Sequence, residues 1–364
     1  MTHHAHARST TRRVAGLLAT VALLATSACS AVGSGGESDE SATDGSKPTK
    51  VVLVTHESFA LPDELVSKFE EESGYELVVR AAGDAGTLSA KLSLTQGNPT
   101  GDAAFGIDNT FASRTLDEGV FDTYEPTLPQ GAEAYALPEG SDRLAPIDVG
   151  HVCVNVDKTW FADKDLAPPV TLEDLTKPAY QDLFVTPGAS TSSPGMAFLL
   201  STIAEYGDEW PAYWERLLGN GAEIVDGWSD AYYTDFTQGG EHGTRPIVLS
   251  YDSSPAFTVP KGEKMSTTAA LLDTCFRSVE YAGVLAGAKN PDGAEALVDF
   301  LLSDEVQAAL PETMYVFPVS STVELPKDWA AFAEQPTAPY DIDPAEISAN
   351  REKWLTEWTD VTTR

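Results

Sequence analysis

The chain has 364 residues, of which 23 are Lys or Arg and 56 are Asp or Glu, and its formal net charge is −33 at pH 7. A nucleic-acid-binding surface needs clustered basic residues, so this balance argues against a nucleic-acid partner. Most of the acidity is a solvated surface, and it favours a cationic ligand over an anionic one only weakly.

The first residues have the pattern of a secretory signal peptide. Three arginines precede the apolar run 14–25, which is too short to span a bilayer, and small residues then lead to Cys29. Residues 1–28 are therefore expected to be a signal peptide. A cysteine at this point resembles a bacterial lipobox, although Thr26 stands where that pattern usually has Leu. We expect Cys29 to be lipidated; an ordinary cleaved signal with an incidental cysteine is the alternative.

Residues 29–48 are rich in Ser, Gly, Glu and Asp and contain almost nothing apolar. Such a segment cannot bury a core, so it is expected to be a flexible tether. A lipid, a tether and a globular body together predict an exported protein held on the outer face of the cell membrane. The body from Lys50 onward is long for a single core, so two lobes are expected.

Strand and helix patterns alternate in the first third of the chain. Apolar runs predict strands, and helical spacing predicts helices, in the order 51–55, 61–72, 77–79, 85–96, 102–107 and 110–118. This alternation predicts a mostly parallel sheet with helices on both faces, the α/β class. In such sheets ligands bind beyond the carboxyl ends of the strands. The polar residues at these ends are His56, Glu57, Ser58, Asp108 and Asn109.

The middle of the chain predicts a second lobe. Residues 144–155 are expected to be a strand that crosses into it, and 184–186 a further strand. The small-residue loop 188–195 contains Ser192 and Ser193 and precedes a helix over 196–206. This loop either meets an anion or a lone-pair acceptor at the helix N-terminus or is a plain N-cap, and the sequence leaves both open. The aromatic side of the helix expected over 210–218 is interpreted as core.

The stretch 227–233 is the most distinctive part of the chain. It places Trp228, Asp230, Tyr232 and Tyr233 within seven residues. Aromatic faces and a carboxylate are what a flat organic cation requires, whereas Trp228 and Tyr232 at i and i+4 also suit a core aromatic pair. A strand is expected to follow at 247–251, with Tyr251 at its end.

The last part of the chain is expected to lead back to the first lobe. Residues 271–284 carry strand-like runs, and helices are predicted at 291–302 and 304–310. Residues 314–319 are expected to be extended. An amphipathic terminal helix over 346–359, with Trp354 and Trp358 at i and i+4, should pack on the body.

Two cysteines remain if Cys29 is lipidated. In an exported chain, Cys153 and Cys275 favour a disulfide over free thiols. A metal site made by this pair is disfavoured, because there is no CxxC spacing and the histidines are scattered.

Catalytic motifs are missing from the sequence. No GxSxG, HExxH or P-loop spacing occurs, so a secreted hydrolase is possible but unsupported. Adjacent tyrosines can hold ferric iron, because phenolate oxygens suit a hard cation. A ferric site made by Tyr232, Tyr233, His56 and Glu57 is therefore an alternative, as is the binding of another small solute.

Short pieces spread along the chain resemble the solute-binding proteins of bacterial ABC importers with the two-lobed type II fold, and more narrowly their thiamine-binding members. The most specific piece is Gly227-Trp228-Ser229-Asp230-Ala231-Tyr232. The other matching pieces, in order, are 106–109, 146–150, 192–195, 249–251, 254–256 and 354–358.

The resemblance implies a monomeric binding protein, not an enzyme and without a cofactor, that closes its lobes around a thiamine-like cation and delivers it to a membrane permease. It implies Asp108 as an acid near the ligand, Trp228 as a stacking surface, Tyr251 as a contact, and the Ser192–Ser193 loop as the holder of a hydroxyethyl or phosphate end. The full set of expected ligand contacts is His56, Ser58, Asp108, Asn109, Ser192, Ser193, Trp228, Tyr232, Tyr251, Phe257 and Tyr315.

Three of these positions depart from the family pattern. His56 and Tyr315 stand where Tyr and Trp are usual, and Phe257 has no hydroxyl to donate. These changes alter phosphate contacts and stacking, so the choice between thiamine and its phosphate esters stays open.

The resemblance also implies a division of the chain. Residues 49–148 and 276–320 would form the first lobe, 149–275 the second, and 321–364 a C-terminal helical segment packed on both. In this fold the outgoing and returning crossing strands lie side by side. A bond between Cys153 and Cys275 would therefore staple the hinge.

Overall fold

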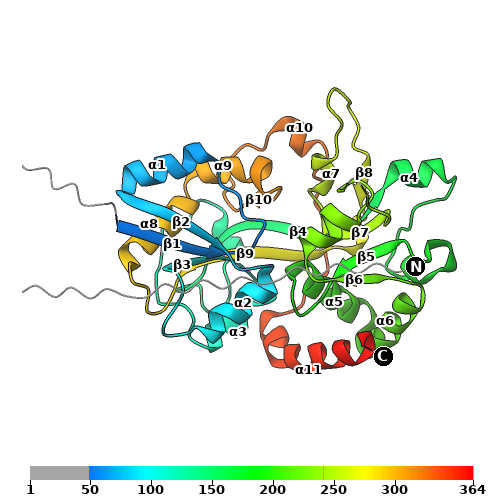
Figure 1. Ribbon diagram of the computed structural model, residues 1–364, viewed down its shortest axis with the longest axis horizontal. Helices are drawn as coiled ribbons and strands as arrows, with labels where there is room; N and C mark the ends of the chain where they lie inside the picture. The colour runs from blue at the N-terminus through cyan, green and yellow to red at the C-terminus, as the bar shows by residue number, and fades with distance from the viewer. Residues whose placement is uncertain (1–48, 241, 364) are drawn as a thin grey trace, which may run out of the picture. The chain divides into compact units, whose positions relative to one another are not determined.

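The computed structural model describes residues 49–240 and 242–363 (Figure 1). The predicted signal peptide (1–28), the predicted lipidation site Cys29 and the whole predicted tether (29–48) lie outside these residues. Within the described ranges, no helix has both the length and the apolar character that crossing a membrane requires.

The first end of the sheet, called the first lobe below, has the predicted alternation of strands and helices. Its strands are parallel and lie in the order β2, β1, β3. They are β1 (Thr49–Thr55), β2 (Tyr75–Ala81) and β3 (Ala103–Asp108), separated by α1 (Asp63–Ser73), α2 (Ala85–Leu94) and followed by α3 (Ala112–Asp117). Val51, Leu53 and Phe105 are fully buried in the core of this lobe. The strand-helix pattern predicted from the sequence is confirmed here.

The other end of the sheet is the second lobe. The parallel strands β7, β5 and β6 form it, and they appear in green and yellow-green in Figure 1. Its elements are α4 (Lys158–Asp163), β5 (Phe184–Pro187), α5 (Ser193–Tyr206), α6 (Trp210–Gly219), β6 (Glu223–Val225), β7 (Ile247–Tyr251), α7 (Ser254–Phe257) and β8 (Thr268–Ala270). Tyr213 and Trp214 of α6 are fully buried, which confirms their interpretation as core.

Short turns of 3₁₀-helix join several of these elements. They are Ala132–Tyr135, Glu173–Thr176, Pro178–Tyr180, Gly207–Glu209 and Leu272–Thr274. The turn Glu173–Thr176 is preceded by a reciprocal cap, in which Thr171 N donates to Asp174 Oδ2 (3.0 Å) and Asp174 N donates to Thr171 Oγ1 (3.3 Å).

Two long antiparallel strands join the lobes. They are β4 (Ala145–Asp157), buried along its whole length, and β9 (Phe276–Val284), which lies between β3 and β4. The strand order is β2-β1-β3-β9-β4-β7-β5-β6, so one sheet runs through both lobes. The crossing strand predicted at 144–155 is confirmed. The exact lobe boundaries remain a prediction, since the described residues form one compact unit.

The C-terminal part of the chain returns to the first lobe, and its last helix then contacts both lobes. It comprises α8 (Pro291–Leu301), α9 (Asp304–Thr313), β10 (Phe317–Pro318), α10 (Lys327–Ala330) and α11 (Pro344–Thr362). Within 314–319, only Phe317 and Pro318, the two residues of β10, pair with another strand, which is β4. Tyr315 has a φ of +57°. The extended segment expected over 314–319 is therefore wrong at Tyr315, where the backbone is left-handed.

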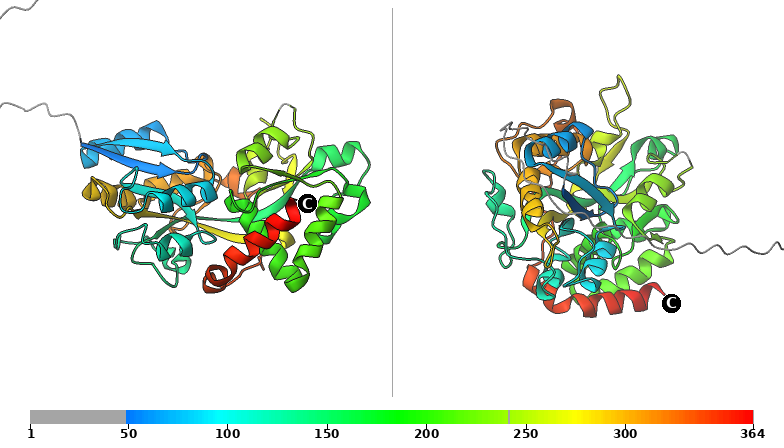
Figure 2. Two further views of the ribbon diagram at one scale, coloured as in Figure 1. Left: turned by 60° about the horizontal axis from the view of Figure 1, so that its bottom comes forward. Right: turned by 60° about the vertical axis from the view of Figure 1, so that its left-hand side comes forward.

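The terminal helix α11, red in Figure 2, contacts α3 of the first lobe and α6 of the second. Trp358 meets Trp214 edge to face, with ring centroids 5.7 Å apart. The Arg351 guanidinium lies 4.4 Å from the centroid of the Phe111 ring. The predicted packing of this helix on the body is confirmed.

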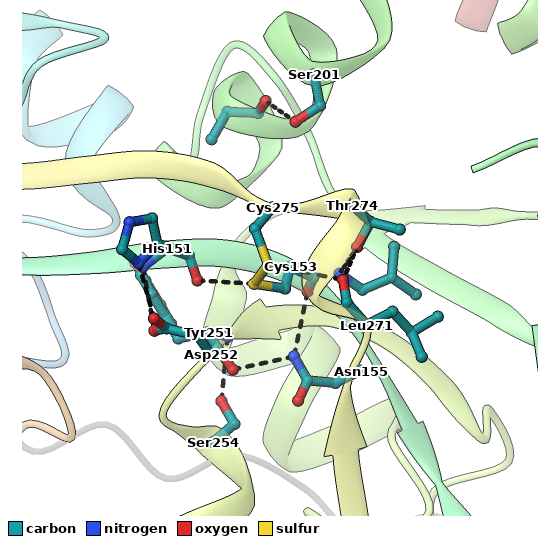
Figure 3. Close-up of a disulfide and its surroundings, with 12 residues drawn as sticks. His151, Cys153, Asn155, Ser201, Tyr251, Asp252, Ser254, Leu271, Thr274 and Cys275 are labelled. Atoms are coloured by element: carbon teal, nitrogen blue, oxygen red, sulfur yellow. Dashed lines mark hydrogen bonds and ion pairs between the residues drawn. A yellow bond between two sulfur atoms is a disulfide. The ribbon is translucent and has the colours of Figure 1, made fainter. Parts of the chain in front are cut away.

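A disulfide joins Cys153 of β4 to Cys275, which directly precedes β9 (Figure 3). The register of the two strands explains the pairing, because the neighbouring residues Val152 and Phe276 are directly opposite each other. The predicted bond is present, and it lies at the end of the crossing pair that belongs to the second lobe.

Candidate ligand-binding site between the lobes

A cavity of about 260 Å³ lies where the loops of both lobes meet. Its volume is near the lower end of the roughly 300–1,000 Å³ that is typical of small-molecule sites. Six aromatic side chains form what we call the aromatic wall: Trp228, Tyr232, Tyr233, Tyr251, Phe257 and Tyr315. Three carboxylates, Glu57, Asp84 and Glu280, form the acidic wall. Along the described part of the chain, no lysine or arginine lines this cavity.

A turn of π-helix at Asp230–Asp235 shapes the aromatic wall. Phe236 N donates to Ala231 O, five residues earlier, so the turn is wider than an α-helix. Trp228 and Tyr232 stack with their ring centroids 5.0 Å apart and their planes at 20°. Both interpretations of this stretch are thus realised, because Trp228 is half of an aromatic pair and also lines the cavity.

The Trp228 ring is fixed at its edge as well as at its face. Its Nε1 donates to Ser250 Oγ at 3.0 Å, and Ser250 Oγ in turn lies 2.7 Å from Ser254 Oγ. Ser250 belongs to β7, so a strand of the second lobe sets the orientation of the indole.

Phe257 and Tyr315 complete the aromatic wall. Their rings meet edge to face, 4.9 Å between centroids. The carbonyl of Tyr315 accepts a hydrogen bond from the Ser253 hydroxyl, which holds this residue in its left-handed conformation. A non-glycine residue with positive φ costs conformational energy, and such residues cluster at functional sites.

Asp84 ties the two lobes together at the acidic wall. Its Oδ1 accepts a hydrogen bond from Ala85 N at the start of α2, and its Oδ2 accepts one from Trp228 N at 2.9 Å. Close packing next to this contact requires Gly86, because a Cβ there would come within 2.7 Å of the Thr191 backbone. The aromatic wall is therefore held by a carboxylate of the opposite lobe.

His56 lies beside Glu280, with Nε2 3.4 Å from Oε1. Gly106, with a φ of +91°, makes room for it, since a Cβ at that position would lie 2.1 Å from the imidazole. Ser58 N donates to Nδ1 at 3.1 Å, which leaves the ring proton on Nε2, facing Glu280. Burial lowers the pKa of His56, but the charge of Glu280 and its contact with the ring, followed by the charges of Asp84 and Glu57, outweigh burial and raise the pKa above its usual value.

Eight of the expected contacts line the cavity together. They are His56, Ser58, Ser193, Trp228, Tyr232, Tyr251, Phe257 and Tyr315. Burial raises the pKa of the Tyr251 hydroxyl well above its usual range, so this group is a neutral hydrogen-bonding partner at neutral pH.

Three expected contacts lie outside the cavity. Asp108 is fully buried behind the wall, where its oxygens accept hydrogen bonds from Thr110, Phe111 and Ser193. Asn109 instead joins β3 to β9, because its Oδ1 accepts from Val279 N at 2.9 Å. Neighbouring protein groups occupy the polar atoms of both residues, which places neither of them on the cavity wall, and their contact with a ligand stays a prediction.

Ser192 is the third of these residues. It stands at the N-cap of α5, fully buried, and its hydroxyl has no hydrogen-bond partner among the described residues. Ser193 is the member of this loop that reaches the cavity, and its hydroxyl donates to Asp108. The loop therefore connects the ligand side of the site to a buried acid, which the sequence pattern did not indicate.

Two lining carboxylates, Asp84 and Glu280, were absent from the predicted set. Asp84 follows β2, so the strand-end rule that selected His56 could also have found it. Glu280 lies within β9 between Val279 and Tyr281, and a single acid in an apolar strand run is the signal that could have identified it.

The four residues of the ferric alternative, His56, Glu57, Tyr232 and Tyr233, also line this cavity. The two tyrosine rings meet edge to face at 5.5 Å, and burial raises the pKa of both hydroxyls. A raised pKa opposes the phenolate form that iron binding requires. In residues 49–240 and 242–363, no group of three or more His, Cys, Asp or Glu side chains is arranged to hold a metal.

The chain is similar to several known proteins over nearly its whole length. It is 29% identical over 325 residues to the thiamine-binding periplasmic protein of Escherichia coli K12, covering 87% of this chain and 94% of that protein. It is 28% identical to the thiamine-binding periplasmic protein of Brucella abortus, with 86% and 92% covered.

Solved structures give the same picture. A periplasmic thiamin-binding protein superposes with a TM-score of 0.76 at 29% identity, covering 88% of this chain and 98% of that one. The iron-bound HitA of Pseudomonas aeruginosa superposes with a TM-score of 0.69 at 20% identity, covering 86% and 99%, which shows a shared fold alone. These matches confirm the two-lobed type II fold of the periplasmic binding proteins.

Residues 103–343, about two thirds of the chain, match the model of a family named for binding solutes rather than for catalysis. The chain belongs to the family of bacterial extracellular solute-binding proteins.

Proposed function

We propose that this protein captures thiamine, or its phosphate esters, outside the cytoplasm and delivers it to an ABC importer in the membrane. The observation that carries the proposal is the combination of six aromatic side chains and three carboxylates around one cavity without a lysine or arginine among the described lining residues. The names of the relatives, thiamine-binding periplasmic proteins, support the same ligand.

The chemistry of the cavity suits a thiazolium cation. A fixed positive charge is attracted to the face of Trp228 and to carboxylates nearby, and the attraction grows when water is excluded. The stacked pair Trp228–Tyr232 offers a flat surface to the ligand's rings, and hydroxyls from Ser58, Ser193 and Ser254 offer hydrogen bonds. The described lining residues include no lysine or arginine, and the one histidine, His56, already lies beside Glu280. We therefore expect unesterified thiamine to bind more tightly than thiamine diphosphate.

Capture would occur by closure of the lobes about β4 and β9. A ligand that contacts both walls stabilises the closed arrangement through its differential affinity for that state. Contacts such as Asp84 Oδ2 to Trp228 N, and Thr87 N to Thr191 O at 3.1 Å, join the two lobes and support this closure. Lipid anchoring at Cys29 would keep the loaded protein near its permease.

Thiamine is expected to bind the purified mature protein and to stabilise it. At a ligand concentration about a hundred times Kd, binding adds roughly 2.7 kcal/mol to the free energy of unfolding, which raises Tm by several degrees. Titration calorimetry and thermal unfolding measure both effects. Choline, a quaternary cation without the rings, is the matched control and should bind far more weakly. If thiamine gives neither heat nor a thermal shift, the proposal is wrong.

Ferric iron is expected to leave the protein colourless. The tyrosine hydroxyls at the cavity have raised pKa values, so they are poor phenolate ligands. Absorption spectroscopy during addition of ferric citrate checks this. A red charge-transfer band, lost in Tyr233→Phe, would favour the ferric alternative instead.

A further inference from the structure

Three carboxyl side chains form a row across the sheet where the lobes join. Glu280 of β9 is directly opposite Asp108 of β3 on one side and Asp148 of β4 on the other. Directly opposite residues project from the same face, with Cβ atoms roughly 5 Å apart. Asp108 and Asp148 are 0% and 1% exposed, and Glu280 is the member of this carboxyl row that reaches the cavity.

Among the described residues no lysine or arginine pairs with the carboxyl row, and His56, whose Nε2 lies 3.4 Å from Glu280 Oε1, is the one group beside it that can carry a positive charge. Ser193 and Thr110 satisfy Asp108 through uncharged hydroxyls. The Arg351 guanidinium packs on the Phe111 ring and acts on Asp108 only at a distance. The titratable and charged groups around the row are His56, Glu57, Asp84, Tyr251, Tyr281 and Arg351.

Repulsion between buried like charges favours retention of a proton by the row. Asp148 Oδ2 is buried and accepts no hydrogen bond from any donor in the described ranges, and Asp148 is the cross-strand partner of Glu280. Two carboxyl groups hydrogen-bond to each other only when one is protonated. Burial, then the charge of Glu280 and the hydrogen bond to it, raise the pKa of Asp148 well above its usual range. Burial also raises the pKa of Asp108 to about 6, against hydrogen bonds from Ser193 and Thr110.

We propose that Asp108, Glu280 and Asp148 share a proton in the free protein and that this proton leaves for solvent when the thiamine cation binds beside Glu280. The inference rests on the proposed function. The net charge of the site stays the same, because the thiamine cation brings one positive charge and the departing proton removes one. Glu280 is thereby the residue that selects for a cation, and Asp108 and Asp148 are positioning residues that act through it.

The sign of the pH dependence follows from this exchange. The free protein carries more protons than the complex, so raising the pH favours the complex. Affinity should rise with pH by up to about tenfold per unit while a full proton is released. Because the pKa of Asp108 is about 6 and that of Asp148 is also raised, the rise should cover the region around and above pH 6 and level off above both pKa values.

Titration calorimetry of the mature protein at pH 7, in phosphate and in Tris, counts the protons released because the two buffers differ in ionisation enthalpy. We expect about half to one proton released per thiamine bound. Asp148→Asn cannot share the proton and should reduce the release to near zero while thiamine still binds. Asp163→Asn, an exposed acid at the end of α4, is the matched control and should release as many protons as the wild type.

His56→Gln separates the carboxyl row from the imidazole beside it. Retained proton release in this variant supports the row as the source, whereas release that is lost in His56→Gln but kept in Asp148→Asn assigns the proton to His56 and overturns the inference.

An infrared band of a protonated carboxyl in the free wild-type protein, abolished by thiamine, tests the same point without a variant. Thiamine binding without proton exchange overturns this inference and leaves the proposed function intact, while a failure of thiamine to bind overturns both.

Discussion

Replacing Trp228 with alanine is expected to weaken thiamine binding by about tenfold or more. A desolvated cation–π contact contributes roughly 2 kcal/mol, and each 1.4 kcal/mol is a factor of ten in Kd. The structure adds a second reason, because Trp228 stacks on Tyr232 with ring centroids 5.0 Å apart, and its loss removes the stacked partner of that ring. Titration calorimetry at fixed pH and salt measures the change in Kd.

Two variants separate the aromatic face of Trp228 from its other roles. Trp228→Phe keeps an aromatic face but loses the hydrogen bond to Ser250, so its Kd should lie between those of the wild type and the alanine variant. Trp160→Ala removes a tryptophan from α4, away from the cavity, and should leave Kd unchanged. A wild-type Kd in Trp228→Ala would return Trp228 to a purely packing role.

The fold was largely predictable because its signals are local. The alternation of apolar runs and helical spacing located β1, β2 and β3, and the stretch 144–155 was correctly interpreted as the strand that joins the lobes. Tyr315 is a residue whose conformation local sequence patterns could not predict. Its left-handed backbone depends on the Ser253 hydroxyl, 62 residues away in the chain, and an apolar run carries no trace of that contact.

The site was predictable where it depends on strand ends and less so where it depends on partners across the cleft. The strand-end rule selected His56 and Ser58, and both line the cavity. The same rule selected Asp108, but Ser193 of the other lobe approaches it and covers its carboxylate. Glu280 was missed because it lies in the middle of a crossing strand, and only the meeting of two lobes turns that position into a cavity wall.

Removal of the disulfide, by the double variant Cys153→Ser/Cys275→Ser, is expected to lower the free energy of unfolding by about 2–5 kcal/mol. The bond closes a loop with a sequence separation of 122 residues. In the chain-entropy account a loop of this length restricts the unfolded state strongly, by close to 5 kcal/mol, and measured values are typically about 2–4 kcal/mol. Urea unfolding monitored by tryptophan fluorescence measures the difference.

The wild-type protein under reducing conditions provides the matched comparison, because it should unfold like the double variant, whereas the variant should not respond to reductant. The closed loop contains nearly all of the second lobe, and the bond lies on the crossing pair rather than among the residues that line the cavity. Thiamine affinity should therefore change far less than stability does. Equal unfolding free energies for the wild type and the variant, or two free thiols in non-reducing mass spectrometry, would show that the cysteines do not staple the hinge in solution.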